Sequence, residues 1–206
     1  PLGYECVVYE ALKTPGGLMR TNIPSFRLPH NVLDEEIGMI TNLGVDVRYN
    51  APVKSLKALL AEGYDAVFVG SGAPKGKELD LPGRQEAAAN VHIGIEWLES
   101  VAFGHIEKIG ERVLIIGVGN TAMDCCRTSK RLGGKDIKVM ARRPRPYFKA
   151  SPWELEDAEG EQVEIIVNHA PKDFVVENGR LKGMTFEVVE WHEDEKGRLR
   201  SKTLEE

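Results

Sequence analysis

The sequence predicts an α/β fold of the Rossmann-like, three-layer kind, in which a parallel sheet has helices on both faces. Short apolar runs alternate along the chain with stretches of helical period. The strongest apolar run, Arg112–Ile116, passes directly through a glycine turn into an amphipathic segment. The same strand–turn–helix order occurs near residues 5–70 and again near residues 112–167. We therefore expect two units of this kind.

The first unit is defined by its apolar runs and by the turn residues between them. Its expected strands are Glu5–Tyr9, Val45–Arg48 and Ala66–Gly70, of which the first and the last are interpreted as buried. Its expected helices, each followed closely by a glycine, are Asn31–Leu43 and Ser55–Ala61. Residues 71–90 contain Gly, Pro, Lys and Asp without periodicity, so we expect a crossover between the units there.

The second unit follows the crossover. Its expected helices are His92–Phe103, a segment from Gly119 to about Leu132, and Pro152–Ala158. Its expected strands are Arg112–Ile116, Lys138–Ala141 and Val163–Val167. An Asn-Gly turn is expected to join Val175–Asn178 to Leu181–Trp191 as a hairpin. The tail, Glu190–Glu206, contains no informative motif.

Composition and charge limit the classes of protein. The chain has 206 residues, of which 42% are hydrophobic, so it can bury a core and is not a disordered segment. Its net charge of −5 argues against a nucleic-acid or anionic-membrane partner. Because no apolar run reaches the ~18–20 residues that span a bilayer and no signal peptide is recognised, we expect a cytoplasmic protein. The start at Pro1, without Met, leads us to expect a piece of a longer protein.

A glycine turn follows the strongest strand, in the sequence VLIIGVGNTAMD of Val113–Asp124. A dinucleotide diphosphate needs close backbone approach at a helix N-terminus, where unpaired N–H groups and the helix dipole attract anions. Gly117 permits the tight turn, Gly119 removes a side chain that would meet the phosphates, and Ala122 lets the helix pack closely on the strand. The place between strand and helix favours a dinucleotide site over an incidental turn.

A basic loop, Arg142–Lys149, begins about 20 residues beyond the glycine turn. An NAD site has an acidic residue there for the ribose 2′-hydroxyl, whereas this chain has Arg142 and Arg143. A guanidinium group presents a planar fork to a phosphate, so the pair predicts a clamp for the 2′-phosphate of NADPH. The alternative is a solvated basic face, which is what most charge runs are. The position at the ribose end of the motif favours the clamp.

The end of the first strand suggests a second nucleotide. Glu10 stands where an acid that meets an adenosine ribose belongs, and Gly16 and Gly17 follow it. If Glu10 is that acid, a further glycine fingerprint lies before Pro1, and FAD is the natural ligand. The alternative is that Glu10 is a surface residue at the end of a strand.

The other chemically active side chains do not form a site in the sequence. Cys125 and Cys126 are interpreted as small packing residues on different helix faces. The five histidines have no metal-ligand spacing, and the three tryptophans are interpreted as packing residues. We nominate no metal ligand and no catalytic acid, base or nucleophile, because hydride transfer takes its chemistry from the cofactors.

Several phrases resemble one family. They are YEALKTPGGLMRTNIPSFRLP (Tyr9–Pro29), YDAVFVGSGA (Tyr64–Ala73), LPG (Leu81–Gly83), VLIIGVGNTAMDCCRTSKRLG (Val113–Gly133) and ARRPR (Ala141–Arg145). In this order they resemble the small (β) subunit of NADPH-dependent glutamate synthase, within the pyridine nucleotide-disulfide oxidoreductase superfamily. Its relatives include the α subunit of NADH-dependent ferredoxin:NADP⁺ oxidoreductases and the reductase part of dihydropyrimidine dehydrogenase. The resemblance covers about residues 1–170.

The resemblance implies an NADPH-binding domain inserted in an FAD-binding domain, with a partial FAD-binding domain at 1–80 and the NADPH-binding domain at 81–206. The implied FAD contacts are Glu10 (ribose), Gly16, Gly17 and Leu18 (diphosphate), Arg20 and Ile23-Pro24 (flavin) and Val53 (adenine). The implied NADPH contacts are Gly117, Val118, Gly119, Asn120, Thr121 and Ala122 (diphosphate) and Arg142 and Arg143 (2′-phosphate). The FAD site is incomplete in this chain, and iron–sulfur clusters are expected only in missing segments or partners.

The expected function is that of an NADPH-dependent flavoprotein oxidoreductase fragment. It would pass hydride from NADPH to FAD, and electrons onward to iron–sulfur clusters or a large acceptor subunit, as in glutamate synthase. The fragment by itself is not expected to be active. One alternative is a non-catalytic module that senses NADPH within a larger assembly, and another is an interaction domain with an empty site.

Overall fold

The computed structural model describes residues 2–204 and divides the chain into two compact units, one ending at Pro74 and the other beginning at Lys75. In the first unit the strands are β1 (Val7–Tyr9) and β2 (Asp46–Arg48), which pair in parallel. Its helices are α1 (Gly17–Thr21), α2 (His30–Thr41) and α3 (Leu56–Leu60). The helix predicted at Ser55–Ala61 is confirmed as α3. It starts where predicted, because the side chain of Ser55, the residue before α3, accepts a hydrogen bond of 3.2 Å from the Ala58 N–H.

One strand expected in the first unit is absent. Ala66–Gly70 forms no helix or strand, and Phe68 within it is 95% exposed. The strand at β1 is present but not buried, since Val8 is 46% exposed. An apolar run becomes a buried strand only where a neighbouring strand completes its hydrogen bonds and another layer covers it. Among the described residues, Ala66–Gly70 has no partner strand, and β1 pairs with β2 alone and stays partly exposed.

The second unit contains a parallel sheet in the order β3-β4-β5. The strands are β3 (Arg112–Ile116), β4 (Asp136–Met140) and β5 (Glu164–Ile166). The helices are α4 (Gly94–Ala102), α5 (Asn120–Arg131) and α6 (Pro152–Gly160), with short 3₁₀ turns η1 (Ala88–Asn90) and η2 (Arg145–Tyr147). Each of these strands and helices was expected from the sequence, so the α/β fold with parallel sheets is confirmed.

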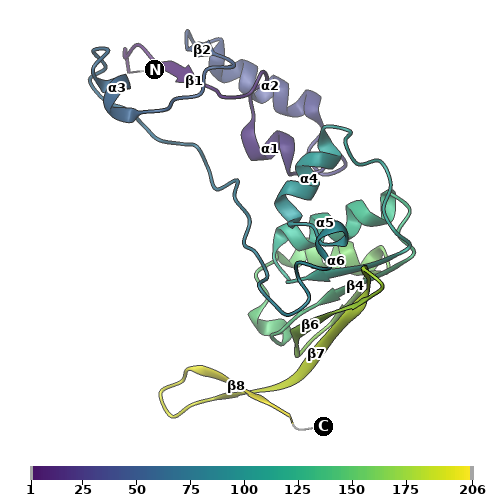
Figure 1. Ribbon diagram of the computed structural model, residues 1–206. Coiled ribbons are helices and arrows are strands. Elements are labelled where there is room, and N and C mark those ends of the chain that lie inside the picture. Colours follow the sequence, from purple (N-terminus) through teal and green to yellow (C-terminus); the bar gives the residue numbers. More distant parts are fainter. Residues whose placement is uncertain (1, 205–206) are drawn as a thin grey trace. The chain divides into compact units, whose positions relative to one another are not determined.

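The layers of the second unit are visible in Figure 1, where α5 and α6 lie on one side of β4 and the β6–β7 ribbon lies on the other. In this view an antiparallel ribbon, and not a second layer of helices, lies beyond β4. A core between helices and sheet contains Met123, Cys126, Ile137, Val139, Ala150, Ala158 and Val163. A second cluster, between α4 and α5, contains Trp97, Leu98 and Cys125. Cys125 and Cys126 thus lie on different faces of α5, as expected.

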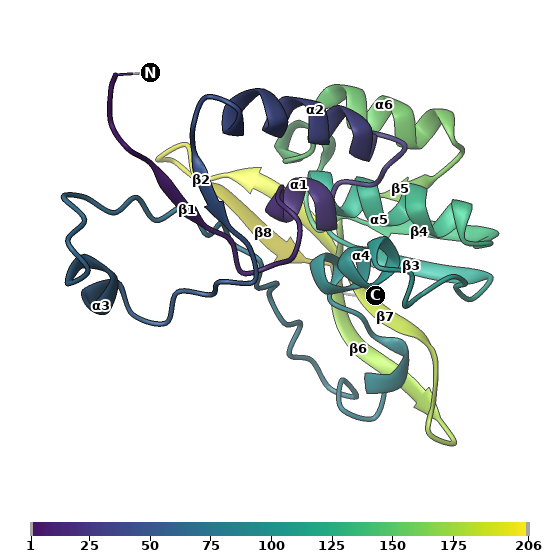
Figure 2. The same ribbon diagram turned by 90° about the horizontal axis from the view of Figure 1, so that it is seen from above.

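An antiparallel ribbon follows the parallel sheet. It consists of β6 (His169–Glu177), β7 (Arg180–Glu193) and β8 (Leu199–Thr203), and Figure 2 shows the β6–β7 hairpin extending beyond the helices. The predicted turn is confirmed, because Asn178 and Gly179 have φ of 52° and 72°, as a two-residue hairpin turn requires. The strand β8 was not expected. It forms because Asp194 accepts backbone hydrogen bonds from Lys196 and Arg198 and so closes a second turn.

Charged side chains join α5 to α6. Arg127, in α5 and 9% exposed at its side chain, pairs with Asp157 at 2.9 Å and with Glu161 at 2.9 Å. Arg131 adds a 2.7 Å bond to Glu161. Hydrogen bonds from Arg131 and Arg127 hold the pKa of Glu161 below its usual value, against the opposing effect of burial. These ion pairs therefore stabilise the packing of α5 on α6 most at pH values at which Glu161 is ionised.

Replacing Glu161→Gln is expected to lower the free energy of unfolding by about 1–2 kcal/mol at neutral pH, because the charge-assisted hydrogen bonds from Arg127 and Arg131 are weakened. A carboxyl whose folded pKa is depressed stabilises the fold above its unfolded pKa and loses that contribution as the pH falls through the folded value. The difference between wild type and variant should therefore vanish in acid. Urea unfolding followed by tryptophan fluorescence measures this, since Trp97, Trp153 and Trp191 all lie in the second unit. An equal difference at all pH values would contradict the assignment.

The thiols differ in their expected reactivity. Burial raises the pKa of Cys126 to about 12 and raises that of Cys125 further, whereas Cys6 is exposed. Because the thiolate is the nucleophile, one thiol per chain should react rapidly with a chromogenic disulfide reagent at neutral pH, and all three only after unfolding. A Cys6→Ser variant should show no rapid phase. Two or three rapid thiols in the native wild type would contradict the packing of α5.

Candidate nucleotide-binding site

The glycine turn joins β3 to α5 and leaves its backbone uncovered. Gly117 has a φ of +115°, which favours glycine, and its N–H donates a 3.0 Å hydrogen bond to the carbonyl of Met140. Gly119 lies immediately before α5, as its N-cap residue. A Cβ atom built on either glycine would meet no atom within 4 Å. The turn therefore offers open space to a ligand in front of the first N–H groups of a twelve-residue helix.

The rest of the turn is fixed from behind. The carbonyl of Val118 accepts hydrogen bonds from the N–H groups of Lys149 and Ala150, at 3.1 and 3.0 Å. The side chain of Asn120 accepts a 2.8 Å bond from the N–H of Ser151, so Asn120 ties the start of α5 to the start of α6. Ala122 packs against the buried core, which is the close helix–strand contact predicted for it. The turn is thus held in one conformation before any ligand is present.

The basic loop lies beside the glycine turn. Ile116 and Met140 are register partners at the carboxyl ends of β3 and β4, so Gly117 and the residues after Met140 leave the sheet at the same edge. Arg142 and Arg143 are exposed, and neither pairs with a carboxylate in the part of the chain that the structure describes. Arg145, by contrast, pairs with Glu159 of α6. Among the described residues, Arg142 and Arg143 therefore have no carboxylate partner, whereas Arg145 has one.

A residue from the antiparallel ribbon contacts this loop. The Trp191 indole N–H, in β7, donates a 2.8 Å hydrogen bond to the carbonyl of Arg142. The guanidinium carbon of Arg143 lies 5.5 Å from the centre of the Trp191 ring. Trp191 was expected to be a packing residue, because the three tryptophans do not cluster in the sequence. Its contact with Arg142 joins residues 49 positions apart and therefore has no local signal. Only the antiparallel pairing of the ribbon brings the two together.

The first unit places Glu10 and the glycine pair near the end of β1. One carboxylate oxygen of Glu10 accepts a 2.8 Å hydrogen bond from the N–H of Leu12. Gly16 has a φ of +116° and lies immediately before α1, and a Cβ there would stand 2.9 Å from Leu33. A Cβ on Gly17 would meet nothing within 4 Å. Gly16 therefore serves the packing of α1 on α2, and Gly17 faces open space.

The remaining candidate residues of the first unit differ in the contacts that their side chains make within that unit. Arg20 donates a 2.6 Å hydrogen bond to the carbonyl of Pro15 and pairs with Asp34, so its side chain is held within the unit. Leu18 lies near Gly72, where a Cβ would approach it at 3.6 Å. Val53 is partly exposed and belongs to no helix or strand.

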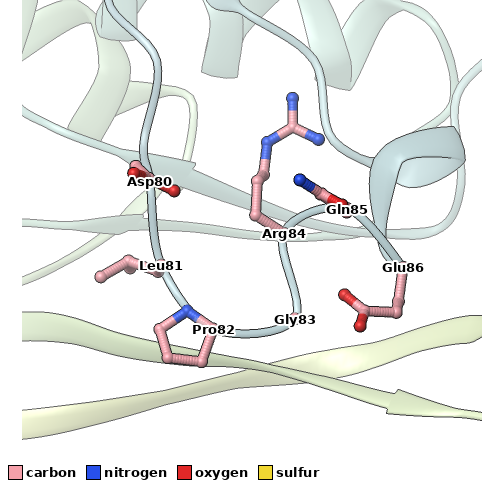
Figure 3. Close-up of a pocket in the computed structure, with 7 residues that line it drawn as sticks. All are labelled: Asp80, Leu81, Pro82, Gly83, Arg84, Gln85 and Glu86. Carbon is pink, nitrogen blue, oxygen red and sulfur yellow. The ribbon is translucent and has the colours of Figure 1, made fainter.

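A shallow pocket of about 340 Å³ lies elsewhere in the second unit (Figure 3), and it is lined by Asp80, Leu81, Pro82, Gly83, Arg84, Gln85 and Glu86. Gly83 closes this turn on β6, because a Cβ there would stand 2.5 Å from the carbonyl oxygen of Phe174. None of the candidate nucleotide contacts lines this pocket. Among residues 2–204 no group of three or more His, Cys, Asp or Glu side chains could hold a metal ion, and no helix is long and apolar enough to cross a bilayer.

The chain matches the family model of pyridine nucleotide-disulphide oxidoreductases over residues 20–200. The chain belongs to this family. Curated members similar to it include the NADP(+)-dependent formate dehydrogenase subunit beta of Moorella thermoacetica, which is 34% identical over 204 residues. A PreT homolog of Salmonella typhi, named as a subunit of NAD-dependent dihydropyrimidine dehydrogenase, is 38% identical over 175 residues.

The chain spans less than half the length of these two relatives. The matches cover 96% and 82% of the chain, but 29% of the formate dehydrogenase subunit and 41% of the PreT homolog. These relatives belong to the same family, but they do not show the more specific resemblance to glutamate synthase.

Solved structures agree on the fold. FprA from Mycobacterium tuberculosis matches with a TM-score of 0.81 and 15% identity, over 98% of this chain and 61% of FprA. Thioredoxin reductase from T. acidophilum matches with a TM-score of 0.58 and 14% identity, over 98% of this chain and 66% of that one. At such identities the likeness shows the fold alone.

Proposed function

We propose that this chain is the NADPH-binding part of a flavoprotein oxidoreductase. The observation that carries the proposal is the pairing, at one edge of the sheet, of an open glycine turn with two guanidinium groups that have no carboxylate partner among the described residues. An anionic ligand with a diphosphate and a further phosphate fits this arrangement. Membership of the family supports the same conclusion.

The residues of the second unit would divide the binding of NADPH between them. Gly117 and Gly119 leave room for the diphosphate, and the first N–H groups of α5 would donate to its oxygens. Asn120 and Val118 keep the turn in place through their bonds to the loop before α6. Arg142 and Arg143 would bind the 2′-phosphate, which distinguishes NADPH from NADH.

We assign residues 1–80 to part of an FAD-binding domain and residues 81–206 to the inserted NADPH-binding domain. The open space at Gly17 and the second carboxylate oxygen of Glu10, for which no partner is recorded in the described chain, fit a nucleotide at the end of β1. The exposure of Val8 and Phe68 fits a domain whose apolar surface is completed by further polypeptide. A flavin held there would supply the hydride-accepting chemistry, and the residues near Glu10 and Gly17 would hold its nucleotide part. The residues of this chain bind and orient the reactants.

The most specific part of the proposal concerns the electron acceptor. We infer a partner subunit that carries iron–sulfur clusters, in an assembly resembling glutamate synthase. The names of the relatives support assembly with other subunits, because they describe a subunit beta of formate dehydrogenase and a subunit of dihydropyrimidine dehydrogenase.

The proposal is tested on the whole natural polypeptide that contains this sequence. We expect it to purify yellow, with a flavin absorbance that NADPH bleaches under anaerobic conditions much faster than NADH does. A colourless protein that binds NADPH would instead indicate a sensing module. A protein that binds neither NADPH nor flavin would overturn the proposal.

A further inference from the structure

We propose that Trp191 is a positioning residue for the coenzyme clamp, and that the β7–β8 ribbon thereby sets the preference for NADPH over NADH. This inference rests on the proposed function, because it concerns how the two arginines are presented to a 2′-phosphate. It assigns a role to Trp191 and to the strand β8 that pairs with it, a part of the chain that contains no informative sequence motif.

Trp191 makes two contacts with the clamp. Its indole N–H donates a 2.8 Å hydrogen bond to the carbonyl of Arg142, which fixes the backbone at the first arginine. Its ring lies under the guanidinium group of Arg143, at 5.5 Å from ring centre to guanidinium carbon. One side chain thus restrains the backbone of the first arginine and the side chain of the second.

The nature of the partner matters as much as the contact. A carboxylate would hold Arg143 equally well but would neutralise its charge, as Glu159 neutralises that of Arg145. An indole ring attracts the cation through its face and occupies none of the guanidinium N–H donors. Arg143 therefore remains charged, orientated and able to form a bidentate bond with a phosphate.

The position of Trp191 is itself fixed by the ribbon. Trp191 is the register partner of Ser201 in the β7–β8 pair, so pairing with β8 holds this part of β7 in a strand. Two residues along, the hydroxyl of Tyr147 donates a 3.4 Å hydrogen bond to Glu193, which adds a second tie between the basic loop and β7. The ribbon is thus a brace for the loop that follows β4.

The test is calorimetric titration of the full chain with NADPH and with NADH, for wild type, Trp191→Leu and Trp191→Phe. Trp191→Leu should raise the Kd for NADPH about fivefold and leave that for NADH unchanged. Trp191→Phe keeps an aromatic face but loses the N–H donor, so it should give an intermediate rise of about twofold. His192→Leu is the matched control, because successive residues of a strand point to opposite faces. It should leave both affinities unchanged.

The outcomes separate the two proposals. A wild type that binds NADPH no better than NADH overturns the proposed function and this inference with it. A wild type that prefers NADPH, with the same preference in Trp191→Leu, overturns the inference alone. If Trp191→Leu loses affinity for both coenzymes, Trp191 has only a structural role, and this result also overturns the inference. If Trp191→Leu does not fold, as judged by circular dichroism, the Trp191→Phe ratio decides, and an unchanged ratio counts against the inference.

Discussion

Replacing Arg142 and Arg143 together by alanine is expected to raise the Kd for NADPH roughly 100-fold and to leave the Kd for NADH unchanged. Each guanidinium group contributes a charge-assisted hydrogen bond to the 2′-phosphate, worth about 1.5 kcal/mol in an exposed site, and two such bonds correspond to about two orders of magnitude. NADH has a hydroxyl in place of that phosphate and loses little. The double variant should therefore bind both coenzymes with similar affinity.

Arg145→Ala is the matched control for this prediction. Arg145 belongs to the same loop and carries the same charge, but it pairs with Glu159 of α6. Its removal should change the Kd for NADPH by less than about threefold, because a neutralised surface ion pair contributes little. If Arg145→Ala weakens NADPH binding as much as the double replacement of Arg142 and Arg143 does, the loop acts as a diffuse basic face and the clamp assignment is wrong.

Gly119→Val is expected to weaken the binding of NADPH and NADH alike, by more than about 100-fold. The φ and ψ of Gly119 are −103° and 174°, an extended conformation that valine adopts readily, so the variant should fold. Its side chain would occupy the open space in front of α5, where the diphosphate is proposed to bind. The two coenzymes share the diphosphate, and the loss is therefore common to both.

Gly160→Val provides the comparison for the glycine turn. Gly160 ends α6, is exposed and also has no atom within 4 Å of an added Cβ, but it lies outside the proposed site. Valine there should leave both affinities unchanged. Retained coenzyme binding in Gly119→Val, with an unaltered melting temperature, would show that the diphosphate lies elsewhere.

The sequence predicted the second unit well because its signals are local. Arg112–Ile116 is apolar and bounded by a glycine, and the helix that follows begins and ends at residues that favour those positions. The Asn178-Gly179 turn likewise determines its own hairpin. A helix, strand or turn that is determined by its own residues could therefore be predicted from the sequence.

The failures concern structure that depends on distant partners. Ala66–Gly70 has the composition of a strand, but pairing decides whether such a run becomes one, and none of the described strands pairs with it. The strand β8 has a polar sequence and forms through its pairing with β7. Trp191 reaches the basic loop only through that ribbon, so its contact with Arg142 could not be predicted from spacing. The glycine and arginine contacts with a coenzyme remain predictions for the experiments above.

The most direct test of the central claim is a pair of calorimetric titrations of the unaltered 206-residue chain, with NADPH and with NADH, in the same low-salt buffer. The paired arginines predict that NADPH binds about 100-fold more tightly, and that this preference shrinks as ionic strength rises, because the 2′-phosphate contact is an exposed charge interaction. Equal affinity for the two coenzymes would contradict the claim.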